Sequence, residues 1–150
     1  MTAVLFVCTG NLCRSPMAQG LFAQRIKGSD IEIHDIDSAG IYARENTPPP
    51  EEAQGAAAES GFDISSIRSR PFDRERDYVR FTHIIAMDEG HLDFLRAVSP
   101  QECIADIRML RVSQGRSISV ADPYGRSMRA YRRALKLIET GITAFIAELS

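Results

Sequence analysis

The segment VLFVCTGNLCRSP, residues 4–16, constrains the fold more than any other stretch of the chain. An apolar run ends abruptly at Cys8, a short polar stretch follows, and Arg14, Ser15 and Pro16 come next. A short, continuous apolar run is typical of a parallel strand that is buried on both faces. Proline suits the first turn of a helix. The segment therefore predicts a buried strand, a tight loop and the start of a helix.

Short apolar runs alternate with longer helical patterns along the rest of the chain. The pattern predicts strands over 3–7, 31–38, 81–87 and 104–109, helices over 15–27, 51–60, 89–98 and 127–149, and loops over 47–50 and 114–125. Strands that alternate with helices indicate an α/β fold with a parallel sheet. Such sheets bind ligands at the carboxyl ends of their strands, and Cys8 lies at such an end.

Length and composition set the broad class of the protein. A chain of 150 residues, 44% hydrophobic and 25% charged, predicts a single globular domain over residues 1–150. We find no apolar run of the roughly 18 residues that a membrane span needs, and no signal peptide pattern. An odd count of three cysteines favours reduced thiols and a cytoplasmic location.

Charge is unevenly distributed although the net charge is only −2. Arg44 is the single base between residues 30 and 63, and Asp122 is the single acid between residues 108 and 136. These segments are either two solvated faces, or the basic one attracts an anionic partner. Nucleic acid is not expected as a partner, because the chain has neither a strongly basic domain nor a recognisable binding motif.

The loop from Cys8 to Ser15 has the features of an anion site. Backbone N–H groups in a tight loop can converge on one point, and a following helix adds its own unpaired donors. Gly10 permits backbone angles that a Cβ would obstruct. Arg14 offers a planar fork that can bind two phosphate oxygens.

The same surroundings favour the thiolate of Cys8 over its thiol, which makes this side chain a candidate nucleophile. The alternative is that Cys8 is a small buried hydrophobe and Arg14 a surface residue. A phosphate ester also needs an acid that protonates the departing oxygen. The candidate is Asp122 in VADPYG, in the polar loop after the last predicted strand.

At this point the sequence resembles the low-molecular-weight protein tyrosine phosphatases. The resemblance rests on VCTGNLCRSP near the start, DSAGI at 37–41, SSIRSRP at 65–71, DYVRFTHIIAMDEG at 77–90 and ADPYG at 121–125. It implies a flavodoxin-like, four-stranded parallel sheet with helices on both faces and a phosphate-binding loop after the first strand. It also implies two-step hydrolysis of phosphotyrosine proteins and aryl phosphates through a phosphocysteine. No metal or organic cofactor is implied, and inorganic phosphate would be both product and competitive inhibitor.

Carried over by position, the resemblance makes Cys8 the nucleophile, Arg14 the phosphate-binding arginine and Asp122 the general acid. Asn11 and Ser38 would hold the loop in shape, and Ser15 would assist Cys8 as leaving group. The expected substrate-binding residues are Thr9, Gly10, Asn11, Leu12, Cys13, Arg14, Ser15, Tyr42, Arg44 and Tyr124.

The chain departs from the family pattern near the expected cleft. Arg44 stands in the segment where many members carry an aromatic wall, so either Tyr42 takes over that wall or the cleft prefers a more acidic substrate. Tyr124 is followed by Gly125, whereas many members have tandem tyrosines.

Two other functions and one further role of the loop stay open. An arsenate reductase of similar fold would need extra relay cysteines, and Cys103 is the only thiol outside the loop. A non-enzymatic anion-binding adaptor would keep the loop without the chemistry. Within the loop, Cys13 is either a small spacer or a thiol that captures an oxidised Cys8 as a disulfide.

Overall fold

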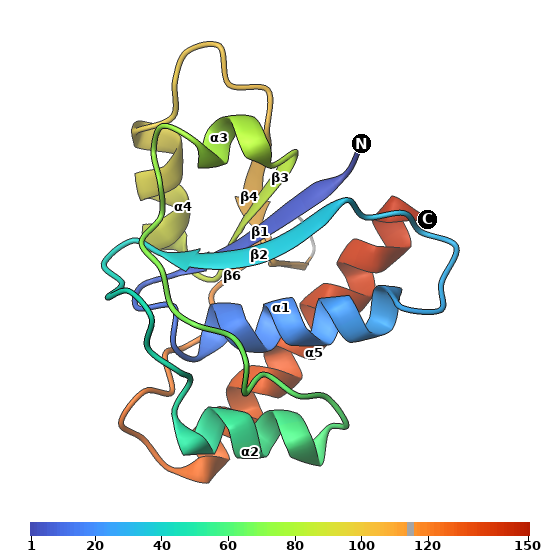
Figure 1. The fold of residues 1–150 in the computed structure, drawn as a ribbon, viewed down its shortest axis with the longest axis vertical. Coiled ribbons are helices and arrows are strands. Elements are labelled where there is room, and N and C mark those ends of the chain that lie inside the picture. Colours follow the sequence, from blue (N-terminus) through green and yellow to red (C-terminus); the bar gives the residue numbers. More distant parts are fainter. Residues whose placement is uncertain (114–115) are drawn as a thin grey trace.

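The computed structural model describes residues 1–113 and 116–150 (Figure 1). Its main sheet has the strand order β2-β1-β3-β4, and every pairing within it is parallel. The strands of this sheet are β1 (Ala3–Cys8), β2 (Asp35–Gly40), β3 (His83–Ala86) and β4 (Asp106–Met109), and β5 (Arg111–Ser113) pairs antiparallel with β6 (Arg116–Ile118). The helices are α1 (Arg14–Ile26), α2 (Glu51–Glu59), α3 (Asp77–Arg80), α4 (Glu89–Ala97) and α5 (Met128–Leu149).

Helices cover both faces of the parallel sheet (Figure 1). Strand β1 is buried along its whole length, and its side chains alternate between two hydrophobic clusters. Val4 and Phe6 join the cluster that α1, α2 and α5 complete, whereas Leu5 and Val7 join the cluster beneath α3 and α4. The expected α/β class, with a central parallel sheet between two helical layers, is confirmed.

Three predicted strands begin later in the structure than the sequence pattern indicates: β3 starts at His83 rather than at residue 81, and β2 and β4 differ as follows. The strand expected from residue 31 starts at Asp35, because pairing with β1 begins at the Ala3–Asp35 register. The strand expected from residue 104 starts at Asp106, opposite His83 of β3, and Ile104 is 98% exposed. In both cases the neighbouring strand, rather than local hydrophobicity, sets the boundary.

Three elements were not predicted, and one of them is the short strand β5 (Arg111–Ser113), which follows the predicted strand 104–109. Helix α3 is a single turn, too short to produce a helical period in the sequence. Strand β6 lies inside the predicted loop 114–125, so the loop prediction is wrong for residues 116–118. Residues 114 and 115 of that predicted loop lie outside the described residues.

The carboxyl ends of the central strands form the edge that carries the site. Strand β1 ends at Cys8, β2 ends beside it at Gly40, and β3 leads into Asp88 at the start of α4. This is the edge at which open parallel sheets bind ligands.

Among the described residues, no helix has the length and apolar character needed to cross a membrane.

Candidate active site

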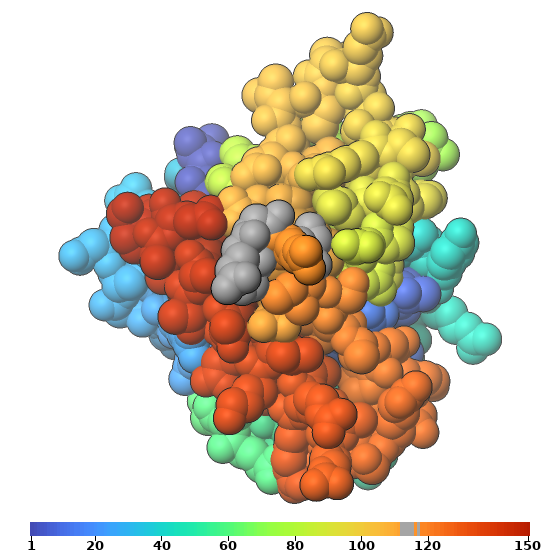
Figure 2. Space-filling model, turned by 180° about the vertical axis from the view of Figure 1, so that it is seen from behind, coloured from blue at the N-terminus to red at the C-terminus, as the bar shows by residue number. Residues whose placement is uncertain are grey.

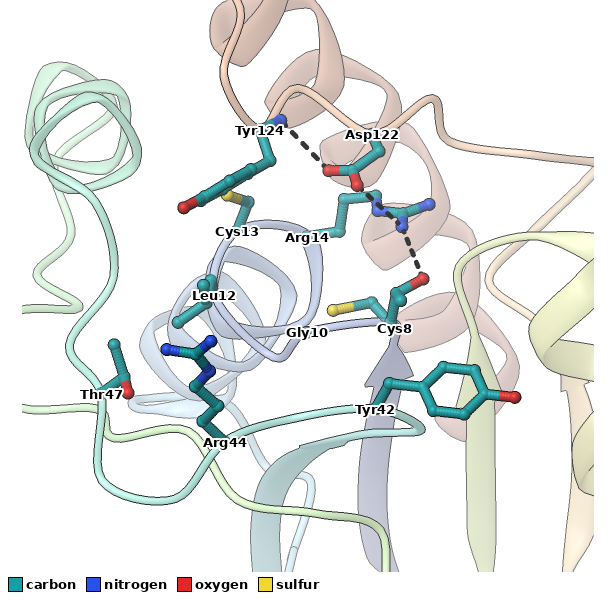
Figure 3. A pocket seen from close by; sticks show the side chains of 11 residues that line it. Cys8, Gly10, Leu12, Cys13, Arg14, Tyr42, Arg44, Thr47, Asp122 and Tyr124 are labelled. Carbon is teal, nitrogen blue, oxygen red and sulfur yellow. Dashed lines mark hydrogen bonds and ion pairs between the residues drawn. The ribbon is translucent and has the colours of Figure 1, made fainter.

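A cavity of about 440 Å³ opens over the loop between β1 and α1 (Figure 3). It brings together almost all the residues that the sequence singled out, although they come from three separate segments. Its lining residues are Cys8, Thr9, Gly10, Leu12, Cys13, Arg14, Tyr42, Arg44, Thr47, Asp122 and Tyr124. Thr47 is the one lining residue among them that the sequence analysis missed. Asn11, Ser15 and Ser38 lie behind this wall, each almost completely buried.

The loop leaves its backbone donors open. Within the described residues, the N–H groups of residues 9–13 have no hydrogen-bond partner in the protein. Helix α1 follows directly, and its N-cap residue, Cys13, makes no side-chain capping bond. Unpaired N–H groups beside a helix N-terminus form a site that favours an anion. Figure 3 shows the Cys8 sulfur directed toward the space that this loop encloses.

Asn11 holds the loop in its curved shape. Its backbone is left-handed, with φ of 54°. Its side-chain amide donates to Ser15 Oγ at 2.8 Å and to Ser38 Oγ at 2.9 Å, and its oxygen accepts the Arg70 backbone N–H at 2.9 Å. The expectation that Gly10 supplies the unusual backbone angle is wrong: its φ is not left-handed, and an added Cβ would meet Leu12 only at 3.9 Å. Asparagine tolerates this conformation because its side chain bonds locally.

Gly40, at the end of β2, lies directly against the loop. A Cβ at this position would come within 2.6 Å of the Thr9 carbonyl oxygen and 2.8 Å of the Asn11 nitrogen. Both are backbone atoms, so they cannot move aside without moving the loop. The glycine therefore sets how closely β2 supports the loop from behind.

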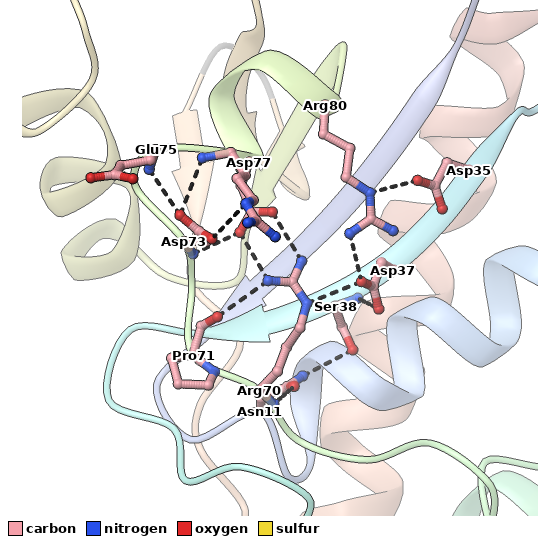
Figure 4. A network of polar contacts seen from close by, with 11 residues as sticks. Asn11, Asp35, Asp37, Ser38, Arg70, Pro71, Asp73, Glu75, Asp77 and Arg80 are labelled. Carbon is pink, nitrogen blue, oxygen red and sulfur yellow. Dashed lines mark hydrogen bonds and ion pairs between the residues drawn. The ribbon is translucent and has the colours of Figure 1, made fainter.

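A polar network continues from Asn11 toward the outside of the molecule (Figure 4). The Arg70 guanidinium donates to both oxygens of the buried Asp77, at 3.0 and 3.1 Å, and to Asp37 at 3.0 Å. Hydrogen bonds to two carboxylates hold the Arg70 backbone in the place where its N–H reaches Asn11. This network anchors the loop to α3 and β2.

The two cysteines of the loop have different partners. Cys8 Sγ lies 2.9 Å from Ser15 Oγ, so the serine hydroxyl can donate to a thiolate. Cys13 donates to Tyr131 Oη at 3.6 Å, and burial raises the pKa of this thiol to about 12. Cys13 is therefore held as a neutral thiol. Cys8, Cys13 and Cys103 are all free cysteines.

Arg14 is 4% exposed and held along one edge of its guanidinium. Its Nη1 donates to Asp88 Oδ2 and to the Val120 carbonyl, each at 2.9 Å. Its Nε is buried and has no hydrogen-bond partner within the described residues. The Nη2 group makes one long hydrogen bond, of 3.4 Å to Thr9 Oγ1, and lies 3.7 Å from an oxygen of Asp122. The Nε–Nη2 edge is thus free to bind two oxygens of an anion.

Asp88 and His91, which the sequence analysis did not assign to the site, lie behind Arg14. The other oxygen of Asp88 caps α4 by accepting the His91 N–H at 2.9 Å. Burial raises the pKa of Asp88, but the His91 N–H bond and the neighbouring Arg14 charge outweigh it, and the pKa lies below its usual range. His91 Nε2 shares a hydrogen bond of 2.7 Å with Thr9 Oγ1. Burial lowers the pKa of His91 to about 4, so the ring is neutral near pH 7. The sequence signals for Asp88 were its place just before the predicted helix 89–98 and its inclusion in the motif at 77–90.

Asp122 faces the loop from the segment after β6. One of its oxygens lies 3.7 Å from Arg14 Nη2, and the other accepts the Tyr124 backbone N–H at 3.1 Å. Tyr124 stands over the loop on the same side of the cavity, and Arg44 approaches Leu12 from the opposite side (Figure 3). Tyr42 lies at the rim and is 80% exposed.

Among the described residues, no group of three or more histidine, cysteine or acidic side chains could hold a metal ion.

The comparisons with known proteins agree with this geometry. The profile of the family described as low molecular weight phosphotyrosine protein phosphatase matches residues 3–150. A low molecular weight protein-tyrosine-phosphatase of Streptomyces coelicolor is 33% identical, with 96% of this chain and 91% of the relative covered. A protein-arginine-phosphatase of Geobacillus stearothermophilus is 30% identical, over 97% and 95%. The crystal structure of a low molecular weight phosphotyrosine phosphatase from Vibrio cholerae superposes with a TM-score of 0.88 at 31% identity, over 99% and 96%.

The chain therefore belongs to the low molecular weight phosphotyrosine protein phosphatase family, as the sequence motifs predicted. Members of this family are hydrolases with a phosphocysteine mechanism, and their flavodoxin-like fold is the one described above.

The close approach of Gly40 to the loop leads to a first prediction. Gly40→Ala should displace the Thr9–Asn11 backbone, lower kcat/KM for an aryl phosphate by roughly 100-fold, and destabilise the fold by about 1–3 kcal/mol. Gly55→Ala is the control: it lies inside α2, where a Cβ would meet only Met128 Cε, at 3.8 Å. This control should keep full activity and gain up to about 1 kcal/mol. Wild-type kinetics for Gly40→Ala would show that the contact does not shape the loop.

The buried, neutral ring of His91 leads to a second prediction. Its pKa is about 4 in the folded protein against 6.5 when free, so the unfolded chain binds an extra proton between these pH values. The free energy of unfolding should therefore fall as the pH drops from 6.5 to 4, by at most about 3 kcal/mol from this residue. Urea denaturation at several pH values should show a flatter dependence for His91→Gln. The control is the exposed His34: His34→Gln should keep the wild-type pH dependence of the free energy of unfolding. If His91→Gln also keeps it, His91 is not the buried neutral ring that causes this dependence.

Proposed function

We propose that this protein hydrolyses phosphotyrosine in proteins, and small aryl phosphates, with Cys8 as the nucleophile. The observation that carries the proposal is the position of the Cys8 sulfur. The sulfur lies inside the loop in which the backbone N–H groups of residues 9–13 have no hydrogen-bond partner among the described residues. It also lies beside the Nε–Nη2 edge of the Arg14 guanidinium. This arrangement suits a phosphoryl group that loses one ester oxygen and gains a bond to sulfur.

In the first step, the Cys8 thiolate attacks phosphorus, and the bond from phosphorus to the phenolic oxygen breaks. Asp122, at the mouth of the cavity, gives its proton to that oxygen. Arg14 and the loop N–H groups bind the three remaining phosphoryl oxygens as their charge redistributes. The hydrogen bond of 3.1 Å that the Tyr124 backbone N–H donates to Asp122 Oδ1 helps to fix the acid above the loop.

In the second step, water attacks the phosphocysteine, and Asp122, now a carboxylate, takes a proton from it. The phosphorus–sulfur bond breaks and the Cys8 thiolate leaves. The hydroxyl of Ser15, 2.9 Å from the sulfur, supports the departing thiolate by donating to it. Inorganic phosphate is released from the same loop, so we expect it to be a competitive inhibitor. The proposed chemistry requires no metal or organic cofactor.

The cavity walls favour phosphotyrosine over phosphoarginine, the substrate that the name of the Geobacillus relative indicates. Leu12, Tyr42 and Tyr124 offer apolar surface that suits a phenyl ring. Arg44 would repel a guanidinium, and among the described lining residues Asp122 is the one carboxylate. Within the proposal, Thr9, Gly10 and Cys13 contact the phosphate, while Asn11, Ser15 and Ser38 act through the shape of the loop.

Two features of the chain argue against the remaining alternatives. Cys103 lines a different cavity, with Tyr78 and Phe81, and therefore lies outside the site where an arsenate reductase would need a relay thiol. A binding adaptor has no use for an acid poised over the nucleophile.

We further propose that residues 1–150 act as one domain in the cytoplasm, where the three free cysteines stay reduced. We propose no nucleic-acid or membrane partner.

Capture of an oxidised Cys8 by Cys13 stays a proposal. The two sulfurs belong to one loop, and both residues line the cavity. Cys13 would first have to release its hydrogen bond to Tyr131, and its raised pKa makes it a slow nucleophile.

The test of the proposed function is hydrolysis by wild type and Cys8→Ser of three substrates: a phosphotyrosine peptide, p-nitrophenyl phosphate and a phosphoarginine peptide. We expect phosphate release from the first two, at least 10-fold slower release from the third, and no turnover by Cys8→Ser. Cys103→Ser is the matched control and should keep wild-type rates. Binding of phosphate without turnover would support the adaptor instead, and faster release from phosphoarginine would make the protein an arginine phosphatase.

The role of Asp122 predicts a dependence on the leaving group. Asp122→Ala should lower kcat by roughly 10²–10⁴-fold for phenyl phosphate, because general acid catalysis is typically worth that much. The loss should shrink for aryl esters whose phenols are more acidic, since these oxygens leave without a proton. Asp122→Asn keeps the shape of the side chain but cannot donate the acid proton, so its loss of kcat should resemble that of Asp122→Ala. An equal loss across the whole series would give Asp122 a structural role.

A further inference from the structure

Four basic residues form a strip on the outer face of α5 and of the turn before it. We define this basic strip as Arg126, Arg129, Arg133 and Lys136. Arg129, Arg133 and Lys136 lie on α5, where spacings of four and three residues place them on one side of the helix, and Arg126 lies in the turn just before it. All four are exposed, whereas Tyr131 and Leu135, on the opposite face of α5, are buried.

The basic strip has no intramolecular counter-charge. Within the described residues, none of its members forms an ion pair, although Arg132 on the same helix pairs with Glu59 at 2.9 Å. Arg129 and Arg133 are four residues apart, a spacing at which like charges repel on a helix. The first turn of α5 contains no acid, and a cation there opposes the helix dipole. These exposed charges are therefore available to an anion outside the protein.

The basic strip is continuous with the proposed active site. Arg126 and Arg133 line a small cavity of about 70 Å³ together with Asp122 and Pro123. Asp122 also lines the main cavity above Cys8, so the two hollows share it as a lining residue. Figure 2 shows the orange segment near residue 120 and the red-orange start of α5 side by side on one surface of the molecule.

The strip has the length of a short peptide. On α5, from Arg129 to Lys136, a helical rise of ~1.5 Å per residue gives about 10 Å. An extended peptide covers this distance with about three residues, at ~3.3 Å each. A substrate whose phosphotyrosine enters the main cavity could therefore lay its neighbouring residues along the strip.

We propose that the basic strip binds acidic residues that flank the phosphotyrosine of the substrate protein, and so selects among substrates. This inference rests on the proposed function. An acidic protein segment fits better than nucleic acid or an anionic membrane, because the chain as a whole has a net charge of −2. That net charge repels a large polyanion, whereas a local strip that begins at the rim of the site attracts a locally acidic peptide.

The experiment compares three phosphotyrosine peptides of equal length, with neutral flanks, with three glutamates before the phosphotyrosine, or with three glutamates after it. Wild-type kcat/KM should be highest for one of the acidic peptides, and 1 M NaCl should remove the preference. Arg129→Gln/Arg133→Gln should lower kcat/KM for the preferred peptide by roughly 3- to 10-fold, mainly through KM. Its activity on p-nitrophenyl phosphate should be unchanged, which also reports correct folding.

The control is Arg76→Gln/Arg132→Gln, which removes the same charge from outside the strip and should keep the wild-type preference. Equal kcat/KM for the three peptides, or an equal loss in both double variants, would overturn the inference. Binding of wild type, but not of Arg129→Gln/Arg133→Gln, to phosphatidylserine vesicles without any peptide preference would also overturn it, in favour of a membrane. If wild type cleaves none of the peptides, the proposed function itself fails, which is a different result from cleavage without preference.

Discussion

The side chain of Asn11 is the interaction on which the rest of the site depends. One left-handed residue, with φ of 54°, bonds at the same time to the start of α1, to β2 and to the backbone of Arg70. These three partners come from segments that are far apart in the sequence. Because the amide uses its two donor hydrogens and its oxygen, the loop is held from behind and its own N–H groups stay open toward the cavity.

The rest of the site adds charge to this preformed loop. Arg14 is almost completely buried, and Asp88 and the Val120 carbonyl fix one edge of its guanidinium so that the other edge is free. Buried donors without partners are unfavourable for folding. The hydrophobic clusters on both faces of β1 supply the compensating stability. Burial of apolar side chains on both sides of the sheet thus offsets the unfavourable free energy of the buried donors in the site.

The accuracy of the sequence-based predictions follows the range of the interactions involved. The strand before Cys8 and the helix after Arg14 were predicted because hydrophobic pattern and proline placement are local signals. The start of β2, the single turn of α3 and strand β6 were not, because pairing partners or a few residues define them. Gly10 was given a role that belongs to Asn11, since the pattern shows which residue can adopt an unusual angle and not which one does.

The sequence by itself determined the family, the order along the chain of the four strands of the parallel sheet and of the four longer helices, and the choice of Cys8, Arg14 and Asp122 as candidates, because these follow from residue types at short spacings. Only the tertiary structure showed that His91 and Asp88 lie behind the loop, that Gly40 must be a glycine, and that a strip of cations continues from the site along α5. The physical reason is distance along the chain. Contacts between residues 30 to 80 positions apart depend on how the parallel sheet assembles, and no local pattern encodes that register.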